Sequence, residues 1–117
     1  MEGELLTSVT RKASTIAYPK RKQPPVDGLR GRITWHIDSC IGCGLCPQAC
    51  PTQAILMTGK SAMAEISYYL NKCIYCGDCI FVCPTHSIEA ATEFELAFTD
   101  QKQMVIHYRR TLPSSED

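Results

Sequence analysis

Two stretches of the chain alternate apolar and polar side chains, a pattern typical of a β-strand with one buried face. Their apolar positions are Ile33, Trp35 and Ile37 in the first stretch and Ile66, Tyr68 and Leu70 in the second. Each stretch precedes a loop, a short helical turn and another apolar run, which includes Ile55 in one case and Ile88 in the other. The pattern predicts four short strands and two small helices, packed as an α+β sandwich.

The two patterned regions resemble one another along their length. Laying "ISYYLNKCIYCGDCIFVCPTHSI" over "ITWHIDSCIGCGLCPQACPTQAI" at a constant offset places Tyr68 on Trp35 and Ile88 on Ile55. A duplicated half-domain explains this match simply. The linking segment "MTGKSAMAE", residues 57–65, has turn residues between apolar flanks. We expect a hairpin loop there, which lets the second half fold back on the first.

The segments outside the repeat have a different composition. From Arg11 to Arg32, seven basic residues stand against one acid, Asp27, and the same stretch holds three prolines. Because proline disfavours a continuous helix, we expect an extended arm. This arm is either a solvated linker or a surface that docks on anionic lipid headgroups or an acidic partner.

The two ends of the chain carry weaker patterns. Upstream of the arm, "ELLTSVTRKAST" predicts a short amphipathic helix, because its apolar residues recur at helical spacing at Leu5, Leu6, Val9 and Ala13. The final "PSSED" is expected to fray. The predicted organisation is therefore an N-terminal basic arm with a short helix (1–32), a central domain that holds the repeat (33–92), and a C-terminal extension and tail (93–117).

Length and charge narrow the functional classes. The chain has 117 residues, 44% of them hydrophobic, and a formal net charge of zero. This suits one small domain with appendages, and it favours neither a nucleic-acid binder nor a disordered chain. No apolar stretch approaches the length of a membrane span, and no apolar export segment follows a basic start. We therefore expect a chain that has no transmembrane span and stays in the cytosol.

The chemistry-bearing residues are cysteines, arranged in two runs with the same spacing. "CIGCGLCPQACP" (40–51) and "CIYCGDCIFVCP" (73–84) both read C-x2-C-x2-C-x3-C-P, and together they use all eight cysteines of the chain. This run is the bacterial ferredoxin pattern, whose fourth cysteine ligates the other cluster. The predicted cofactors are two [4Fe-4S] clusters. One is assigned to Cys40, Cys43, Cys46 and Cys83, and the other to Cys73, Cys76, Cys79 and Cys50.

Two other uses of dense cysteines remain as alternatives. A disulfide scaffold needs an oxidising compartment and an export signal, and neither has support in the sequence. A zinc module is the more serious alternative, because paired C-x2-C elements bind zinc through four thiolates. A third and a fourth cysteine at fixed spacing, repeated twice, favour clusters over zinc. Since clusters hold the halves together, the metal-free chain should be largely unstructured.

Residues around the cysteines are expected to tune the clusters. Gly42, Gly44 and Gly77 allow the backbone to approach a cluster closely and to direct amides at sulfur. Tyr75 replaces the first loop's Gly42, and either shields the second cluster from water or packs in the core. His86 follows the last ligand and lies either near a cluster or in an exposed loop. His36 and His107 are most simply strand or surface residues.

No catalytic site is apparent in the sequence. There is no Ser/His/Asp set, no glycine-rich phosphate loop and no pair of carboxylates at catalytic spacing. We expect one-electron transfer only, with substrate turnover on another subunit or partner.

Longer segments resemble known families. The repeat, from Ile33 to about Ala91, resembles the bacterial 2[4Fe-4S] ferredoxins. "YPKRKQPPVDGLRGRITW" and "EFELAFTDQKQMVIHY" are similar to segments that flank the cysteine runs in the ferredoxin-like subunit of respiratory complex I and its relatives. Among these relatives, "CIYCGDCIFVCPTHSIEAATEFELA" most closely resembles subunits of membrane-bound, energy-converting [NiFe] hydrogenases and related ferredoxin-oxidising complexes.

That resemblance implies a role and a location. It implies a peripheral subunit on the cytoplasmic side of the cell membrane, which passes electrons between ferredoxin or an input subunit and the catalytic subunits of an ion-pumping complex. All eight cysteines match the ligand motif of the family. The alternative is a free soluble ferredoxin, for which the basic arm and the C-terminal extension would have little use.

Overall fold

The computed structural model describes residues 2–110. Its helices and strands, in chain order, are α1 (Glu2–Thr10), β1 (Ile33–Trp35), α2 (Leu45–Ala49), β2 (Ile55–Thr58), β3 (Glu65–Tyr69), α3 (Asp78–Val82), β4 (Ile88–Ala90) and β5 (Val105–Arg109), with 3₁₀ turns at Ser61–Met63 and Gln101–Met104. All strands but the last lie where the apolar pattern predicts them. The central region is thus a small mixed structure of helices and sheets.

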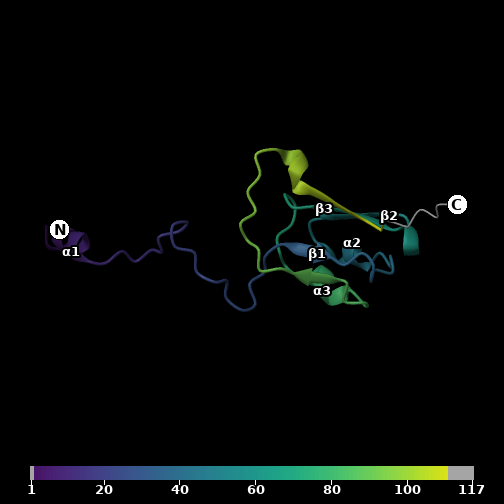
Figure 1. Cartoon of the computed structure of the whole chain (residues 1–117), viewed down its shortest axis with the longest axis horizontal. Coiled ribbons are helices and arrows are strands. Elements are labelled where there is room, and N and C mark those ends of the chain that lie inside the picture. The colour runs from purple at the N-terminus through teal and green to yellow at the C-terminus, as the bar shows by residue number, and fades with distance from the viewer. Residues whose placement is uncertain (1, 111–117) are drawn as a thin grey trace.

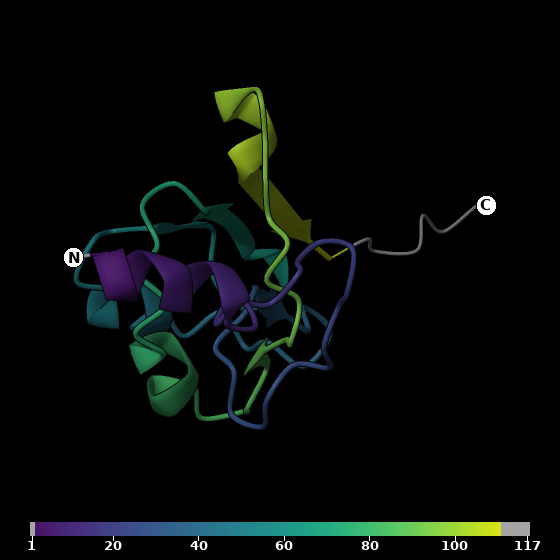
Figure 2. The same ribbon diagram turned by 90° about the vertical axis from the view of Figure 1, so that its left-hand side faces the viewer.

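The molecule is elongated because its N-terminal segment leaves the body. The structure measures 78 × 32 × 27 Å, and its radius of gyration is 20.6 Å, against about 13 Å for a compact chain of this length. Figure 1 shows α1 at the far end of an extended segment, away from the strands. Figure 2 looks along that segment, with α1 facing the viewer and the 101–104 turn standing out from the body.

Two antiparallel sheets build the body. In the smaller sheet β1 pairs with β4, and Trp35 lies opposite Ile88. The larger sheet has the order β2-β3-β5, with Met57 opposite Ile66 and Tyr108 also opposite Ile66 from the other side. The smaller sheet therefore joins a strand that precedes the first cysteine run to one that follows the second.

The expected hairpin between β2 and β3 is present. The two strands pair antiparallel across a tight connection that contains Gly59 and the turn Ser61–Met63. Gly59 has a φ of 79°, and a Cβ atom there would lie 2.4 Å from the carbonyl oxygen of Met63. Only glycine meets both conditions without strain.

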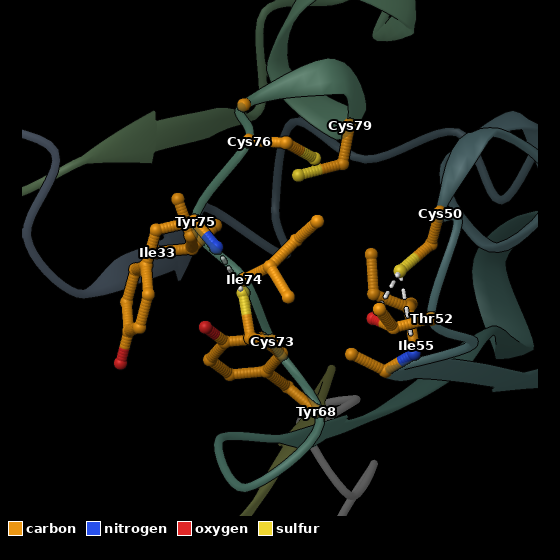
Figure 3. A pocket seen from close by; sticks show the side chains of 12 residues that line it. Ile33, Cys50, Thr52, Ile55, Tyr68, Cys73, Ile74, Tyr75, Cys76 and Cys79 are labelled. Atoms are coloured by element: carbon orange, nitrogen blue, oxygen red, sulfur yellow. Dashed lines mark hydrogen bonds between the residues drawn. The ribbon is translucent and has the colours of Figure 1, made fainter.

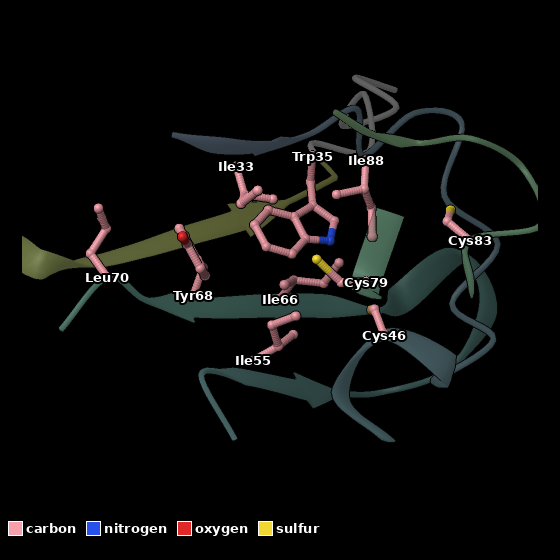
Figure 4. Close-up of a cluster of buried hydrophobic side chains, with 10 residues drawn as sticks. All are labelled: Ile33, Trp35, Cys46, Ile55, Ile66, Tyr68, Leu70, Cys79, Cys83 and Ile88. Atoms are coloured by element: carbon pink, nitrogen blue, oxygen red, sulfur yellow. The ribbon is translucent and has the colours of Figure 1, made fainter. Parts of the chain in front are cut away.

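The core lies between the two sheets, and cysteines form part of it. Its buried members are Ile33, Trp35, Cys46, Ile55, Ile66, Tyr68, Leu70, Cys79, Cys83 and Ile88 (Figure 4). The alternating residues of both patterned stretches are among them, except Ile37, which is only partly buried. Burying one large apolar side chain of this kind stabilises the fold by about 1.5–3 kcal/mol.

The N-terminal segment follows its sequence pattern in part. Helix α1 ends at Thr10, so Ala13 lies outside it, and the apolar side chains of Leu5, Leu6 and Val9 are all exposed. Residues 11–32 contain no helix or strand. Among residues 2–110, no helix is long and apolar enough to cross a membrane. The C-terminal "PSSED" lies outside the described residues.

The end of the arm packs closely on the strand region. Gly31 is buried, and a Cβ atom there would lie 2.3 Å from the carbonyl oxygen of Ala91 and 2.4 Å from that of Glu93. The neighbouring Arg32 exchanges backbone hydrogen bonds with the same two residues, at 2.8 and 2.9 Å. The glycine of "LRGRI" is therefore required by a close backbone approach, which extends the β1–β4 pairing.

Candidate iron–sulfur site

Each cysteine run folds into a loop followed by one short helix. Helices α2 and α3 are preceded by Gly44 (φ 76°) and Gly77 (φ 87°), whose left-handed conformations favour glycine. The third cysteine of each run lies in the first turn, where both Cys46 and Cys79 are buried. The fourth cysteine returns to an extended conformation after the last helical residue, before the proline. The two runs thus have the same local geometry, and α2 packs against α3.

The second loop shares a cavity with a cysteine from the first run. The cavity is lined by Cys73, Cys76 and Cys79 together with Cys50 (Figure 3). Its other lining residues are largely apolar, among them Ile33 and Ile55, at the edge of the core. The four cysteines that the sequence assigns to the second cluster are therefore brought together around one space.

The thiols of the first loop also lie near one another. Burial raises the pKa of Cys46 to about 12, and the nearby Cys40 and Cys43 add to the shift. The indole of Trp35 lowers the pKa of Cys46 and so opposes this rise. Cys83, the fourth member of this predicted set, is buried in the same apolar core as Cys46 (Figure 4).

The buried thiol of the second loop behaves in the same way. The pKa of Cys79 is raised to about 11, chiefly by burial, and the nearby Cys73, Cys76 and Cys50 also raise it. A thiol must lose its proton to bind iron, so a metal must replace the proton at these positions.

The fourth cysteine of each run has a matching set of hydrogen-bond donors. The sulfur of Cys50 accepts from the amide of Ala54 at 3.3 Å and lies 3.6 Å from the hydroxyl of Thr52. The sulfur of Cys83 accepts from the amide of Ser87 at 3.3 Å and lies 3.6 Å from the hydroxyl of Thr85. Burial raises the pKa of both thiols, but these hydrogen bonds outweigh it and leave the pKa lowered. These hydrogen bonds therefore stabilise the thiolate form at both positions.

This donor set fits iron–sulfur clusters. A [4Fe-4S] cluster is held by four cysteine thiolates, and the second loop with Cys50 offers four around one cavity. The cavity between Cys50 and the second loop is apolar, as suits a cluster kept from water, and the amide of Tyr75 already donates to the sulfur of Cys73 at 3.4 Å.

The two loops are covered by different means. A Cβ atom on Gly42 (φ 65°) would lie 2.6 Å from the amide nitrogen of Ser61 and 2.9 Å from Cβ of Ala64, so the hairpin connection covers the first loop. Tyr75 has the same left-handed conformation (φ 55°) and lines the cavity of the second loop, where burial raises its pKa. Its side chain also lines a second hollow with Leu96. Tyr75 therefore both packs and covers the second loop.

Two arginines from outside the repeat hold the cysteine loops, and the sequence did not single out either role. Arg30 donates from Nη1 to the carbonyl of Cys76 at 2.8 Å. Nη2 of Arg110 donates to the carbonyls of Cys40 at 2.7 Å and Ile37 at 2.8 Å. Arg30 belongs to the "LRGRI" segment, whose pattern could have drawn attention to it. No sequence signal marks Arg110, which depends on the position of β5.

None of the three histidines lines the cavity of the second loop. His86 is exposed, as the loop interpretation expects, and its backbone amide donates to the carbonyl of Cys83 at 3.4 Å. The imidazole of His36 lies 2.8 Å from the carboxylate of Glu89, and that of His107 lies 3.0 Å from the hydroxyl of Ser67.

Comparison with known proteins agrees with this geometry. Residues 39–94 match the family model described as "4Fe-4S dicluster domain". The chain is 46% identical over 46 residues to the chloroplastic NAD(P)H-quinone oxidoreductase subunit I of Zygnema circumcarinatum, covering 39% of this chain and 25% of that protein. It is 42% identical over 45 residues to NADH-quinone oxidoreductase subunit I of Carboxydothermus hydrogenoformans, covering 38% of this chain and 32% of that protein. The matches thus span a quarter to a third of these curated relatives.

A solved structure is similar over more of the chain. It is a chain in the structure of the membrane-bound sulfane sulfur reductase (MBS), an archaeal respiratory membrane complex, with a TM-score of 0.67 and 25% identity. The similarity covers 86% of this chain and 56% of that one. Residues 39–94 therefore form a 4Fe-4S dicluster domain that carries two [4Fe-4S] clusters and is homologous to part of NADH-quinone oxidoreductase subunit I.

Proposed function

We propose that this chain is an electron-relay subunit of a membrane-bound, ion-pumping complex. It carries single electrons between ferredoxin, or a neighbouring input subunit, and the catalytic subunits of a complex I-like or [NiFe] hydrogenase-like assembly. The two clusters supply one-electron redox chemistry. The chain itself holds the thiolates, keeps water from the second loop through Tyr75, and links the loops to its flanking segments through Arg30 and Arg110.

The proposed ligation crosses between the two runs. Cys40, Cys43, Cys46 and Cys83 hold one cluster, and Cys73, Cys76, Cys79 and Cys50 hold the other. The shared cavity supports the second set, because Cys50 faces the second loop across it (Figure 3). With crossed ligation, each half of the domain needs a cysteine of the other half to complete its cluster. The proposal therefore includes a duplicated ferredoxin-like arrangement within residues 33–92.

One observation carries the proposal of a relay subunit over that of a free carrier. The similarity to the archaeal respiratory complex covers 86% of the chain, whereas the dicluster domain, residues 39–94, is less than half of it. The likeness therefore includes segments that a minimal cluster carrier would not need. In this proposal residues 1–32 and 93–117 are extensions that contact other subunits, and the chain sits peripherally at the cytoplasmic face of the membrane.

The decisive experiment is anaerobic affinity purification from the native host, with mass spectrometry of the accompanying chains and an iron and sulfide assay. We expect integral membrane subunits together with a [NiFe] or quinone-site subunit, and two cubane clusters per copy of this chain. Which catalytic subunit accompanies it identifies the electron acceptor. A brown protein that purifies alone would contradict the relay and favour a free ferredoxin, and a colourless protein would contradict both.

A further inference from the structure

Tyr68 carries a buried polar group that the fold leaves without a partner. Its side chain is 1% exposed, at the centre of the core, yet its hydroxyl has no hydrogen-bond partner among the described residues. An unsatisfied buried hydroxyl costs about 1–3 kcal/mol. Such a group in an otherwise well-packed core calls for a specific reason. Phenylalanine would fill the same space without that cost.

The position of the hydroxyl suggests the reason. Tyr68 lines the same cavity as Cys50, Cys73, Cys76 and Cys79. Figure 3 shows its oxygen beside the sulfur of Cys73, on the side of the cavity. A neutral thiol is only a weak acceptor. A cluster-bound thiolate carries negative charge and accepts a much stronger hydrogen bond.

Trp35 carries a second buried donor without a partner. Trp35 occupies the position in the first half that Tyr68 occupies in the second. Its side chain is 5% exposed, and its indole Nε1 also lacks a partner among residues 2–110. Trp35 and Cys46 belong to the same buried core cluster. Strands β1 and β3 thus each carry one buried donor, an N–H and an O–H, that has no partner among residues 2–110.

We propose that the Tyr68 hydroxyl donates a hydrogen bond to the Cys73 sulfur of the loaded second-loop cluster, and that this bond raises the reduction potential of that cluster. This rests on the ligand sets proposed above. Reduction adds one electron to a cluster and makes its sulfurs more negative, so a donor stabilises the reduced form more than the oxidised form. Tyr68 is a positioning residue for electron transfer and is not a ligand.

The test compares Tyr68→Phe with Tyr69→Phe in the purified, cluster-loaded protein. Both substitutions remove only a hydroxyl, but Tyr69 lies on the opposite face of β3 and lines a different hollow. The iron content is measured first, and each cluster is then titrated anaerobically with detection by electron paramagnetic resonance. We expect Tyr68→Phe to keep its full iron content and to lower the potential of the second-loop cluster only. Tyr69→Phe should leave both potentials unchanged.

A second readout detects the bond directly. Exchange into D2O should shift the Fe–S stretching bands of the second-loop cluster in resonance Raman spectra, and Tyr68→Phe should reduce that shift. An unchanged second-loop potential in Tyr68→Phe at full iron content would overturn the proposal. Loss of iron from Tyr68→Phe would overturn it too, because it would show a structural role. Either result leaves the purification test of the relay unaffected.

Discussion

Trp35 and Tyr68 lie ring against ring in the core, with their centroids 4.9 Å apart and their planes inclined at 52°. One residue belongs to β1 of the smaller sheet and the other to β3 of the larger sheet. Tyr108 of β5 adds a third ring, 5.3 Å from Trp35. This aromatic contact joins the two sheets next to both cysteine loops, so the packing of the body and the geometry of the sites depend on the same side chains.

Replacing Trp35 should therefore loosen the whole body. We expect Trp35→Ala to destabilise the loaded protein by about 3–5 kcal/mol, the usual cost of removing a large core aromatic. The measurement is the temperature at which the cluster absorbance disappears on anaerobic heating. Leu56→Ala is the control, since Leu56 is 51% exposed. Equal transition temperatures for Trp35→Ala and the control would contradict a central role for this contact.

The crossed ligand sets predict which cluster responds to a lost cysteine. Cys50→Ser should perturb the cluster of the second loop, and Cys83→Ser that of the first, because each fourth cysteine serves the other run. Electron paramagnetic resonance of the reduced proteins, with an iron assay, distinguishes the two clusters. A first-loop cluster that disappears in Cys50→Ser, with the second intact, would refute the crossing.

The tight packing above the first loop predicts a specific role for Gly42. Gly42→Ala combines an unfavourable left-handed conformation with a contact of 2.6 Å to Ser61, and we expect it to cost about 1–3 kcal/mol. Gly44→Ala is the matched control, since its φ is 76° but no atom lies within 4 Å. Iron content and thermal loss of cluster absorbance should fall more in Gly42→Ala. Similar losses in both variants would mean that conformation alone matters.

Arg30 and Arg110 should protect different clusters. Arg110→Ala removes hydrogen bonds to the carbonyls of Ile37, Asp38 and Cys40, so the first-loop cluster should lose iron faster to a chelator. Arg30→Ala removes the bond to Cys76 and should affect the second. Each lost bond is worth about 0.5–1.5 kcal/mol.

The control for these two variants is Arg109→Ala. Arg109 is next to Arg110 but forms an exposed ion pair with Glu65 at 2.6 Å, and exposed pairs contribute little. Its rates of iron loss should equal those of the unmodified protein. If Arg30→Ala and Arg110→Ala accelerated loss of the same cluster, the proposed separation of their roles would be wrong.

The basic arm is predicted to contribute to membrane or partner binding. Neutralising Lys20 and Arg21 with glutamine should weaken co-sedimentation with vesicles of anionic lipid by about 1 kcal/mol per charge. Lys22 is already paired with Glu95 at 3.0 Å, and the hydroxyl of Tyr18 donates to the same carboxylate. Lys22→Gln should therefore chiefly release the arm from the C-terminal segment.

Salt and lipid charge provide the controls for the arm. Binding should weaken as salt is raised, and vesicles of neutral lipid should show no difference between the variants and the unmodified protein. Unchanged co-sedimentation of the double variant with anionic vesicles would show that the arm is only a linker.

Local sequence determined much of this molecule. The spacing of the cysteines specified two loops with the same geometry, because a ligand run of this length has few ways to direct several sulfurs inward. Alternating side chains at Ile33 to Ile37 and Ile66 to Leu70 specified two strands and the face that each one buries. The turn residues of 57–65 specified the hairpin.

Tertiary structure decided what depends on contacts between distant segments. Strand β5 was not predicted, because it forms by pairing with β3, which is distant in the sequence. In this pairing Arg109 lies opposite Glu65. That pairing in turn places Arg110 against the first loop. The cavity between Cys50 and the second loop, and the unpaired donors of Tyr68 and Trp35, likewise arise only when both sheets pack. Short-range spacing dictates which residues can bind iron, whereas the packing of the sheets dictates which residues surround it.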